Sequence, residues 1–343
     1  MSVSLPDFHG YSNEVIADTI KSSLSTKLDI NRFMTPDYSL SENLGMKKKI
    51  HKYTIADGSQ VDDLSRGADN THQVDAVFSV SEYEVGRTQG TIMYADDDVM
   101  TDSTLVDAKV RFLSESMVND WTKKAIAEFN KSENICAITG YNLENFANML
   151  SAYTSVYEST EGLFFLANQS LDAKLRKMLG DSLQYTEGYI KTGAIGTVLG
   201  VPVYLSKAVP AGIIFLATRE AVTAFIKKDV NVEQDRNIGT KVNRIVASRY
   251  SVIALTDETK CVVCGAAQAT AATITTAAST TVAGAATTGA TVKVYVNGEY
   301  AGTGTASGSA YSVTVAALSS NDVVKVIAEL EGYVASIATA TVA

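Results

Sequence analysis

The chain has 343 residues and a formal net charge of −9, with 46% hydrophobic and 20% charged residues. This composition excludes wholesale disorder, and the length suits two domains or one large domain with a satellite. The acidic balance argues against tight, general binding to nucleic acid, which needs a face rich in Lys and Arg.

The first 45 residues predict a short helix followed by extended chain. Residues 1–7 lack the basic and then apolar layout of a secretory signal, and no run of about 18 apolar residues occurs in the sequence. We therefore expect a cytoplasmic product with no membrane partner. Because the apolar residues are few and scattered, we expect this arm to find its core on a neighbouring molecule. The helix is predicted from Val15, Ile16, Thr19, Ile20 and Leu24.

Residues 47–94 predict a long two-stranded hairpin. Strand-like stretches at residues 50–55 and 74–85 flank a polar segment at residues 57–70, and Val74, Ala76, Phe78 and Val80 alternate along the second stretch. An isolated hairpin is marginal in water, so we expect this one to lie against something else, with another subunit as one candidate.

The clearest helix is predicted from Thr104 to Asn130. Thr104 and Asp107 have capping-box spacing, and the helix would be roughly 40 Å long. We interpret the acidic run at residues 96–98, with Asp102, as a solvated turn and not as a cation site. Apolar residues recur every three or four positions, at Val106, Val110, Leu113, Met117, Trp121, Ala125 and Phe129.

Residues 134–255 alternate between helix-like and strand-like segments and predict a mixed α/β domain. Helices are expected at residues 143–153, at 171–179 and, as a short one, near 219–225. Strands are expected at residues 162–167, 201–205 and 213–217 and around 250–255.

Composition changes at about Gly265. Residues 266–281 are mostly Ala and Thr, which indicates a linker or a first edge strand. Short β-type runs follow, and Asn297-Gly298 between two of them is a strong hairpin signal. A small β-sandwich is predicted, with strands at residues 290–296, 299–302, 311–315, 323–328 and 336–342.

No constellation of residues predicts an enzyme. The three histidines lie in the arm or the hairpin region, and the glycines of residues 193–200 lack a following Gly-Lys-Ser/Thr. Cys261 and Cys264 have the spacing of half a zinc site without a second pair, so we interpret them as small buried residues rather than as a metal or redox site. With Cys136 the cysteines are odd in number, which fits a reducing compartment. We predict no catalytic, cofactor-binding or metal-binding residue and no cofactor.

A family resemblance covers roughly three quarters of the chain. Gly200-Val201-Pro202-Val203 and Val209-Pro210-Ala211-Gly212, with the order of the motifs around them, resemble major capsid proteins of tailed bacteriophages with the Hong Kong 97 fold. The matching motifs are residues 196–207, 209–212, 215–218, 221–222, 232–236, 245–250 and 252–255.

The resemblance implies an α+β chain with the family's parts in order. These would be an N-terminal arm (1–45), an extended loop (46–100), the spine helix of a peripheral domain (101–134), an axial domain (135–245) and a return to the peripheral domain (246–265). A linker (266–280) would then lead to an all-β domain (281–343). Residues 289–298 and 311–315 of that domain are similar to bacterial immunoglobulin-like repeats.

The implied function is that of a major capsid protein, which forms hexamers and pentamers of an icosahedral head around double-stranded DNA without reading its sequence. The resemblance implies a location in the virion after assembly in the host bacterial cytoplasm. Partners would be further copies of the chain, portal and head-completion proteins and, because the sequence begins almost directly with its arm, a separate scaffold protein. Lys47, Lys48, Lys49 and Lys52 lie at the base of the loop, so we predict no covalent crosslink.

Three arginines, Arg32, Arg66 and Arg236, are our candidates for intersubunit contacts. The immunoglobulin-like domain is expected to be displayed outward and to bind a cell-surface or glycan ligand. Two alternatives remain open: an encapsulin-type nanocompartment shell, which shares the fold but carries enzyme cargo, and a β-sandwich surface adhesin.

Overall fold

The computed structural model describes residues 30–42, 45–55, 63, 65–66, 76–102, 104–154, 161–181, 194–278 and 280–342. The chain divides into two compact units. Unit 1 contains Met1–Leu24, Pro36–Met117 and Ala224–Ala254, and unit 2 contains Ser25–Thr35, Val118–Thr223 and Leu255–Ala343. The helix expected from Val15 and most of the hairpin tip lie outside the described residues. In the part that is described, no helix is long and apolar enough to cross a membrane.

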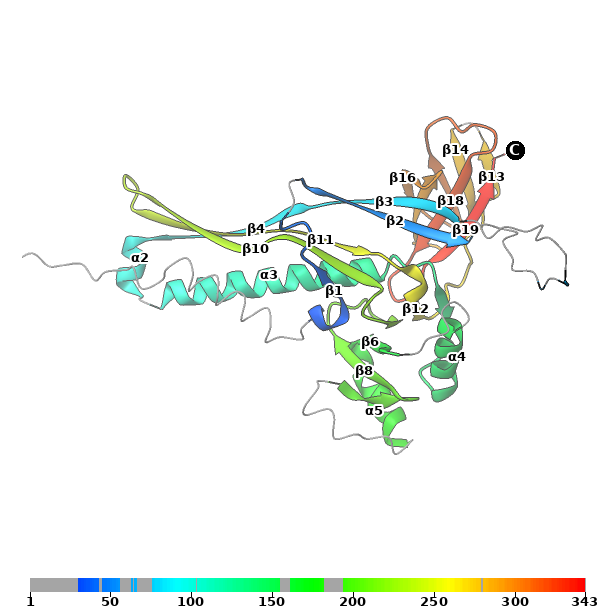
Figure 1. The fold of residues 1–343 in the computed structure, drawn as a ribbon, viewed down its shortest axis with the longest axis horizontal. Coiled ribbons are helices and arrows are strands. Elements are labelled where there is room, and N and C mark those ends of the chain that lie inside the picture. The colour runs from blue at the N-terminus through cyan, green and yellow to red at the C-terminus, as the bar shows by residue number, and fades with distance from the viewer. Residues whose placement is uncertain are drawn as a thin grey trace, which may run out of the picture. The chain divides into compact units, whose positions relative to one another are not determined.

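Unit 1 is built on a four-stranded sheet that one long helix covers. The strand order is β1-β10-β11-β4, and β4 pairs antiparallel with β11 from Val242↔Ala95 to Ser251↔Gly86. The helix α3 runs along the sheet (Figure 1). The bounds are β1 (Thr35–Asp37), β4 (Gly86–Ala95), β10 (Val222–Asn237), β11 (Val242–Leu255) and α3 (Leu105–Phe129).

The helix α3 confirms the predicted apolar stripe. Each of the seven stripe residues is buried. In unit 1 the first four, Val106, Val110, Leu113 and Met117, pack in one cluster with residues of β10 and β11 that alternate along their strands: Val230, Val232, Ile245 and Ala247. At the start of the helix, Asp102 Oδ1 accepts hydrogen bonds from Thr104 N at 2.9 Å and from Thr104 Oγ1 at 2.7 Å.

One local prediction in this region is wrong, and a second is only partly right. The short helix expected near residues 219–225 is absent, because β10 begins at Val222 and pairs with β11. Its β-branched and aromatic residues suit a strand whose proximal half is buried. The acidic residues 96–98 lie before the long helix with Asp97 and Asp98 exposed, as predicted, but they form the first turn of a short helix, α2 (Asp96–Thr101), instead of an isolated turn. Carboxylates favour that position because the helix N-terminus carries partial positive charge.

The predicted hairpin is present in the described residues as β2 (Lys47–Ile55) and β3 (Ala76–Glu84). The strands pair antiparallel from Lys47↔Glu84 to Ile55↔Ala76 and form a sheet of their own. At its base Ile50 and Tyr83 pack against a buried cluster of Leu40, Val85, Phe225 and Ala254. The base of the hairpin is therefore anchored in unit 1.

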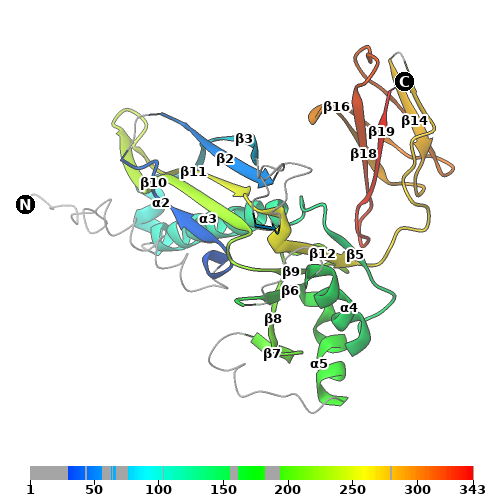
Figure 2. The same ribbon diagram turned by 45° about the vertical axis from the view of Figure 1, so that its right-hand side comes forward.

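Unit 2 contains a six-stranded mixed sheet, as the predicted α/β pattern requires. Its order is β5-β12-β9-β6-β8-β7. Residues of α4 (Leu143–Thr154) and α5 (Asp172–Asp181) join one core cluster with the sheet, so both helices cover the same face (Figure 2). The strands are β5 (Ile135–Ala137), β6 (Phe164–Asn168), β7 (Ala194–Val198), β8 (Val201–Ser206), β9 (Ile214–Ala217) and β12 (Cys261–Gly265).

The opposite face of this sheet is covered by aromatic side chains. Along β6, Phe165 and Ala167 point to the helices, so Phe164 points the other way. Phe164 lies 4.7 Å from Phe33 and 6.3 Å from Phe129, measured between ring centroids. We call Phe33, Phe129, Phe164, Tyr204 and Phe215 the aromatic cluster.

The C-terminal residues form the predicted β-sandwich. Sheets with the orders β13-β14-β17 and β16-β15-β18-β19 enclose one core (Figure 2). The Ala/Thr-rich segment supplies β13 as an edge strand. At the predicted turn, Asn297 and Gly298 have φ of 51° and 85°, as a two-residue hairpin loop requires. The strands are β13 (Thr276–Ala278), β14 (Thr281–Ala285), β15 (Thr291–Val296), β16 (Glu299–Thr305), β17 (Ala310–Thr314), β18 (Val323–Glu329) and β19 (Ser336–Thr341).

Substitution of Gly284 by Ala is expected to destabilise the sandwich by about 1–3 kcal/mol, since an added methyl group cannot be accommodated without moving backbone. A Cβ at Gly284 would lie 1.8 Å from the carbonyl oxygen of Thr273. Calorimetric melting measures the change. Gly140→Ala is the control, because its Cβ would have its nearest neighbour at 3.9 Å. Equal melting of the two variants would contradict this close approach.

Candidate assembly elements

The last part of the predicted arm is anchored within its own chain. The 3-10 helix η2 (Ile30–Phe33) places Ile30 and Phe33 in the interior of unit 2, and Met34 is 1% exposed. Arg219 Nε donates to the carbonyl oxygen of Met34 at 2.7 Å. The expectation that the arm finds its core on a neighbour is therefore wrong for these residues, while residues 1–29 lie outside the described part.

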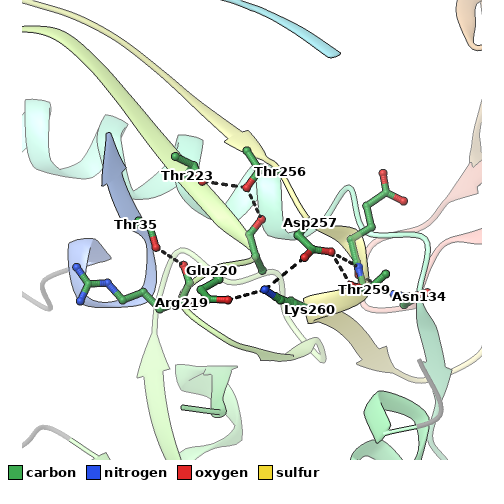
Figure 3. A network of polar contacts seen from close by, with 11 residues as sticks. Thr35, Asn134, Arg219, Glu220, Thr223, Thr256, Asp257, Thr259 and Lys260 are labelled. Carbon is green, nitrogen blue, oxygen red and sulfur yellow. Dashed lines mark hydrogen bonds and ion pairs between the residues drawn. The ribbon is translucent and has the colours of Figure 1, made fainter. Parts of the chain in front are cut away.

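A polar network holds this segment to two turns of unit 2 (Figure 3). Thr35 Oγ1 donates to the carbonyl oxygen of Arg219 at 3.2 Å. The next residue, Glu220, accepts from Lys260 Nζ at 2.5 Å, and Lys260 Nζ also lies 3.5 Å from an oxygen of Asp257. The side chain of Lys260 is 16% exposed, so its ammonium group is partly withdrawn from water beside two carboxylates.

The same network fixes the start of β10 to the end of β11. The carbonyl oxygen of Ala221 accepts from the backbone N–H groups of Thr256 and Asp257, at 2.9 and 3.2 Å. The hydroxyls of Thr223 and Thr256 lie 2.9 Å apart. Figure 3 shows the side chains of Thr223 and Thr256 pointing toward each other. Ion pairs, hydroxyl hydrogen bonds and backbone hydrogen bonds of this network thus hold three chain segments together.

Charged pairs hold the base of the β2/β3 hairpin. Lys47 Nζ lies 2.6 Å from a carboxylate oxygen of Glu82, and Lys49 Nζ lies 3.3 Å from the other. The hydrogen bond from Lys47 lowers the pKa of Glu82 below its ordinary value. Tyr83 stacks on Phe225 with ring centroids 5.6 Å apart. These contacts fix the base of the hairpin, where β2 begins and β3 ends.

Beyond the base, the hairpin lacks support from other strands of the described chain. The two-stranded sheet of β2 and β3 has no third strand among the described elements, and Val80 on β3 is 48% exposed. Two strands alone are marginally stable in water. The distal hairpin is therefore a candidate surface for packing against another molecule.

The structure places the three candidate arginines on separate elements. Arg32 is exposed on η2, with its guanidinium carbon 5.9 Å from the ring centre of Tyr204. Arg66 is exposed in a turn between β2 and β3. Arg236 Nη2 donates to Asp96 Oδ2 at 2.6 Å, and Asn243 Nδ2 donates to the other oxygen of the same carboxylate at 2.6 Å. Arg236 thus has an intrachain partner that the sequence did not reveal.

The structure separates the two cysteines of the Cys-x-x-Cys motif. Cys264 belongs to the core cluster between the sheet and its helices, whereas the Cys261 thiol contacts the carbonyl oxygen of Phe129 at 3.7 Å. Residues three apart in a strand point to opposite faces, so these thiols cannot share an ion. Within the described ranges there is no group of three or more His, Cys, Asp or Glu side chains placed to hold a metal. The cross-strand neighbour of Cys264 is Cys136 on β5. The spacing of the cysteines in the sequence does not indicate this pairing.

Comparison with known proteins rests on structure alone. No protein-family model matches this sequence, and no curated protein matches it. The chain is similar to the capsid of Ralstonia phage GP4, with a TM-score of 0.54 and 7% identity over 70% of this chain and 89% of that one. It is also similar to a chain of Mycobacterium phage Che8 (TM-score 0.52, 16% identity, 68% and 89% covered) and to the capsid of Cyanophage P-SCSP1u (0.52, 11%, 69% and 88%).

These likenesses show the fold. The mixed α and β chain has a capsid-type fold that it shares with phage proteins. Each comparison spans most of the phage chain and roughly two thirds of this one, so the fold accounts for the greater part of the described residues.

Proposed function

We propose, from the phage-capsid fold of this chain, that it is a major capsid protein of the Hong Kong 97 type. It self-assembles into hexamers and pentamers of an icosahedral head shell around double-stranded DNA. The protein acts by association and not as an enzyme, and its place is the virion after assembly in a bacterial cytoplasm.

One observation carries the proposal: phage capsid chains match this fold over 88–89% of their own length at TM-scores above 0.5. The β2/β3 hairpin supports it, because two strands without a third need a further surface to pack against. Interfaces of permanent assemblies bury roughly 2,000–5,000 Å² or more, which suits an element that has little core of its own.

We also propose that the chain is divided into the arm, extended loop, spine helix, axial domain and immunoglobulin-like domain that the family resemblance implies. Arg32 and Arg66 stay candidate intersubunit contacts, and Arg236 would have to share or leave its pairing with Asp96 to serve as a third. A separate scaffold protein and the portal and head-completion proteins are the expected partners beside further copies of the chain.

Sedimentation velocity of the purified full-length chain, alone and with its candidate scaffold, tests the proposal. Capsomer rings or shells are the expected species, and a folded monomer at every concentration would contradict it. The contents of native particles then separate two kinds of shell. Double-stranded DNA is expected, whereas enzyme cargo would identify a nanocompartment.

We further propose that the C-terminal sandwich is an immunoglobulin-like module displayed on the shell, with a cell-surface or glycan ligand. Its own complete core supports independent folding. Its backbone contacts with the end of the preceding domain are made at Ala266, the residue after β12: Val334 N donates to the carbonyl oxygen of Ala266 at 2.9 Å, and Tyr333 forms a bridge with Ala266. Lys325 also pairs with Glu133.

Truncation after Gly265 is therefore expected to leave assembly within about twofold of the full chain, because the sandwich has a core of its own and its loss removes no strand from the six-stranded sheet of unit 2. Sedimentation yield of shells measures the effect, and circular dichroism of the truncated chain checks that the remainder is folded. Poor assembly of a well-folded truncation would instead assign the sandwich a structural role.

A further inference from the structure

Cys136 and Cys264 are direct neighbours on adjacent strands. β5 and β12 run parallel, and their register sets Cys136 opposite Cys264. Neighbouring strands lie about 4.8 Å apart, which is inside the range of about 4.4–6.8 Å between Cα atoms that a disulfide spans. Both side chains belong to the same apolar cluster, so they point to the same face of the sheet.

The two thiols differ in access and in acidity. Cys264 is fully buried, whereas Cys136 is partly exposed at the edge strand of the sheet. A hydrogen bond from Cys264 lowers the pKa of the Cys136 thiol to about 7. The same contact and burial raise the pKa of Cys264. Near neutral pH, Cys136 is therefore the thiolate that meets reagents from solution, since nucleophilic attack requires the thiolate.

Cys261 provides an internal comparison. It lies on the same strand as Cys264, but it points to the other face and is fully buried. Burial raises the pKa of its thiol to about 12. Cys261 is therefore expected not to react with thiol reagents in the folded protein. A labelling experiment can use it as the unreactive control for Cys136 and Cys264.

We propose that Cys136 is a site of oxidative thiol modification by small disulfides such as oxidised glutathione, and that Cys264 resolves the adduct into a Cys136–Cys264 disulfide. The inference rests on the register of β5 and β12 and on the shared cluster, and it holds whether or not the chain forms a shell.

The reaction balances in two exchange steps. The Cys136 thiolate attacks one sulfur of oxidised glutathione, forms a mixed disulfide and releases one glutathione thiolate. Cys264 then gives its proton to a released thiolate, and its sulfur attacks Sγ of Cys136, which expels the second glutathione. Two protein thiols are oxidised, and one oxidised glutathione is reduced to two glutathione molecules.

The resulting bond is expected to be reversible by thiols, because one of its sulfurs, Sγ of Cys136, lies on the partly exposed edge strand of the sheet. It would join the three-residue edge strand β5 to β12, the strand that leads into the C-terminal sandwich. Oxidation would thus link the edge strand β5 covalently to its neighbour β12.

Mass spectrometry of the full-length protein tests the proposal. The protein is incubated with oxidised glutathione at neutral pH, its free thiols are blocked, and it is digested without reduction. The wild type is expected to give a linked peptide pair containing Cys136 and Cys264. Cys264→Ser should keep glutathione on Cys136, Cys136→Ser should give neither product, and Cys261→Ser should match the wild type.

The pH dependence gives a second readout. With a pKa near 7, the thiolate fraction of Cys136 rises about tenfold between pH 6 and pH 8. An ordinary thiol of pKa about 8.5 would rise more than about fiftyfold over the same interval. Wild-type protein that stays fully reduced while folded, glutathione on Cys261, or an adduct in Cys136→Ser would each overturn the assignment.

Discussion

Replacement of residues 51–80 by Asn-Gly is expected to abolish shell assembly while the subunit stays folded. Ile50 pairs with Ser81 in the hairpin, so a two-residue loop joins them in register. The base residues Ile50 and Tyr83, which pack against unit 1, remain in place. The variant removes the part of the hairpin that lacks a third strand in the described chain and, by our proposal, packs on a neighbouring subunit.

The expected effect on assembly is large. Loss of one of the main contacts between subunits should raise the protein concentration needed for assembly at least about 100-fold, the equivalent of about 3 kcal/mol per contact. Light scattering over a concentration series measures this threshold. Lys49→Gln is the control, because it removes one exposed charge and leaves the hairpin intact. Shells formed by the shortened chain at wild-type concentrations would remove the hairpin from the assembly mechanism.

Substitution of Phe33 by Ala is expected to destabilise unit 2 by about 3–5 kcal/mol, the usual cost of deleting a buried aromatic ring. Phe33 is 2% exposed, and its ring lies 4.7 Å from Phe164 and 4.9 Å from Tyr204. Removal of the ring leaves a cavity in the aromatic cluster. It also frees the segment that Arg219 and Thr35 hold by hydrogen bonds.

Urea unfolding followed by the fluorescence of Trp121 measures this change, because Trp121 lies in unit 2 and its indole N–H donates to Asn31 Oδ1, in η2, at 3.0 Å. Arg32→Ala is the matched control, since the neighbouring side chain is exposed. The control is expected to cost less than about 1 kcal/mol. Equal midpoints for the two variants would show that the N-terminal segment is not anchored through Phe33.

Elements with strong local signals could be predicted from the sequence. The stripe from Val106 to Phe129 identified α3, because its spacing matches the helical repeat over seven positions. Asn297-Gly298 identified a hairpin, because both residues adopt positive φ readily. β10 was not predicted: a short helix was expected near residues 219–225, and the distal residues 233–237 are polar and exposed, so the strand is defined by its pairing with β11.

The contacts that matter most for the candidate sites could not be predicted in the same way. Arg236 meets Asp96 across 140 positions of the sequence, and the hydrogen bond between Arg219 and Met34 spans 185. Cys136 meets Cys264 only because β5 adds to the edge of the sheet in parallel. Local patterns carry no information on such pairings, which depend on topology.

Negative-stain electron microscopy of the full-length chain, expressed with and without its candidate scaffold, would show directly whether the chain assembles. Closed shells or rings of five and six subunits are expected, with the C-terminal sandwich as extra density that the truncation after Gly265 removes. A well-folded chain that remains a dispersed monomer in every preparation would contradict the assignment as a capsid protein.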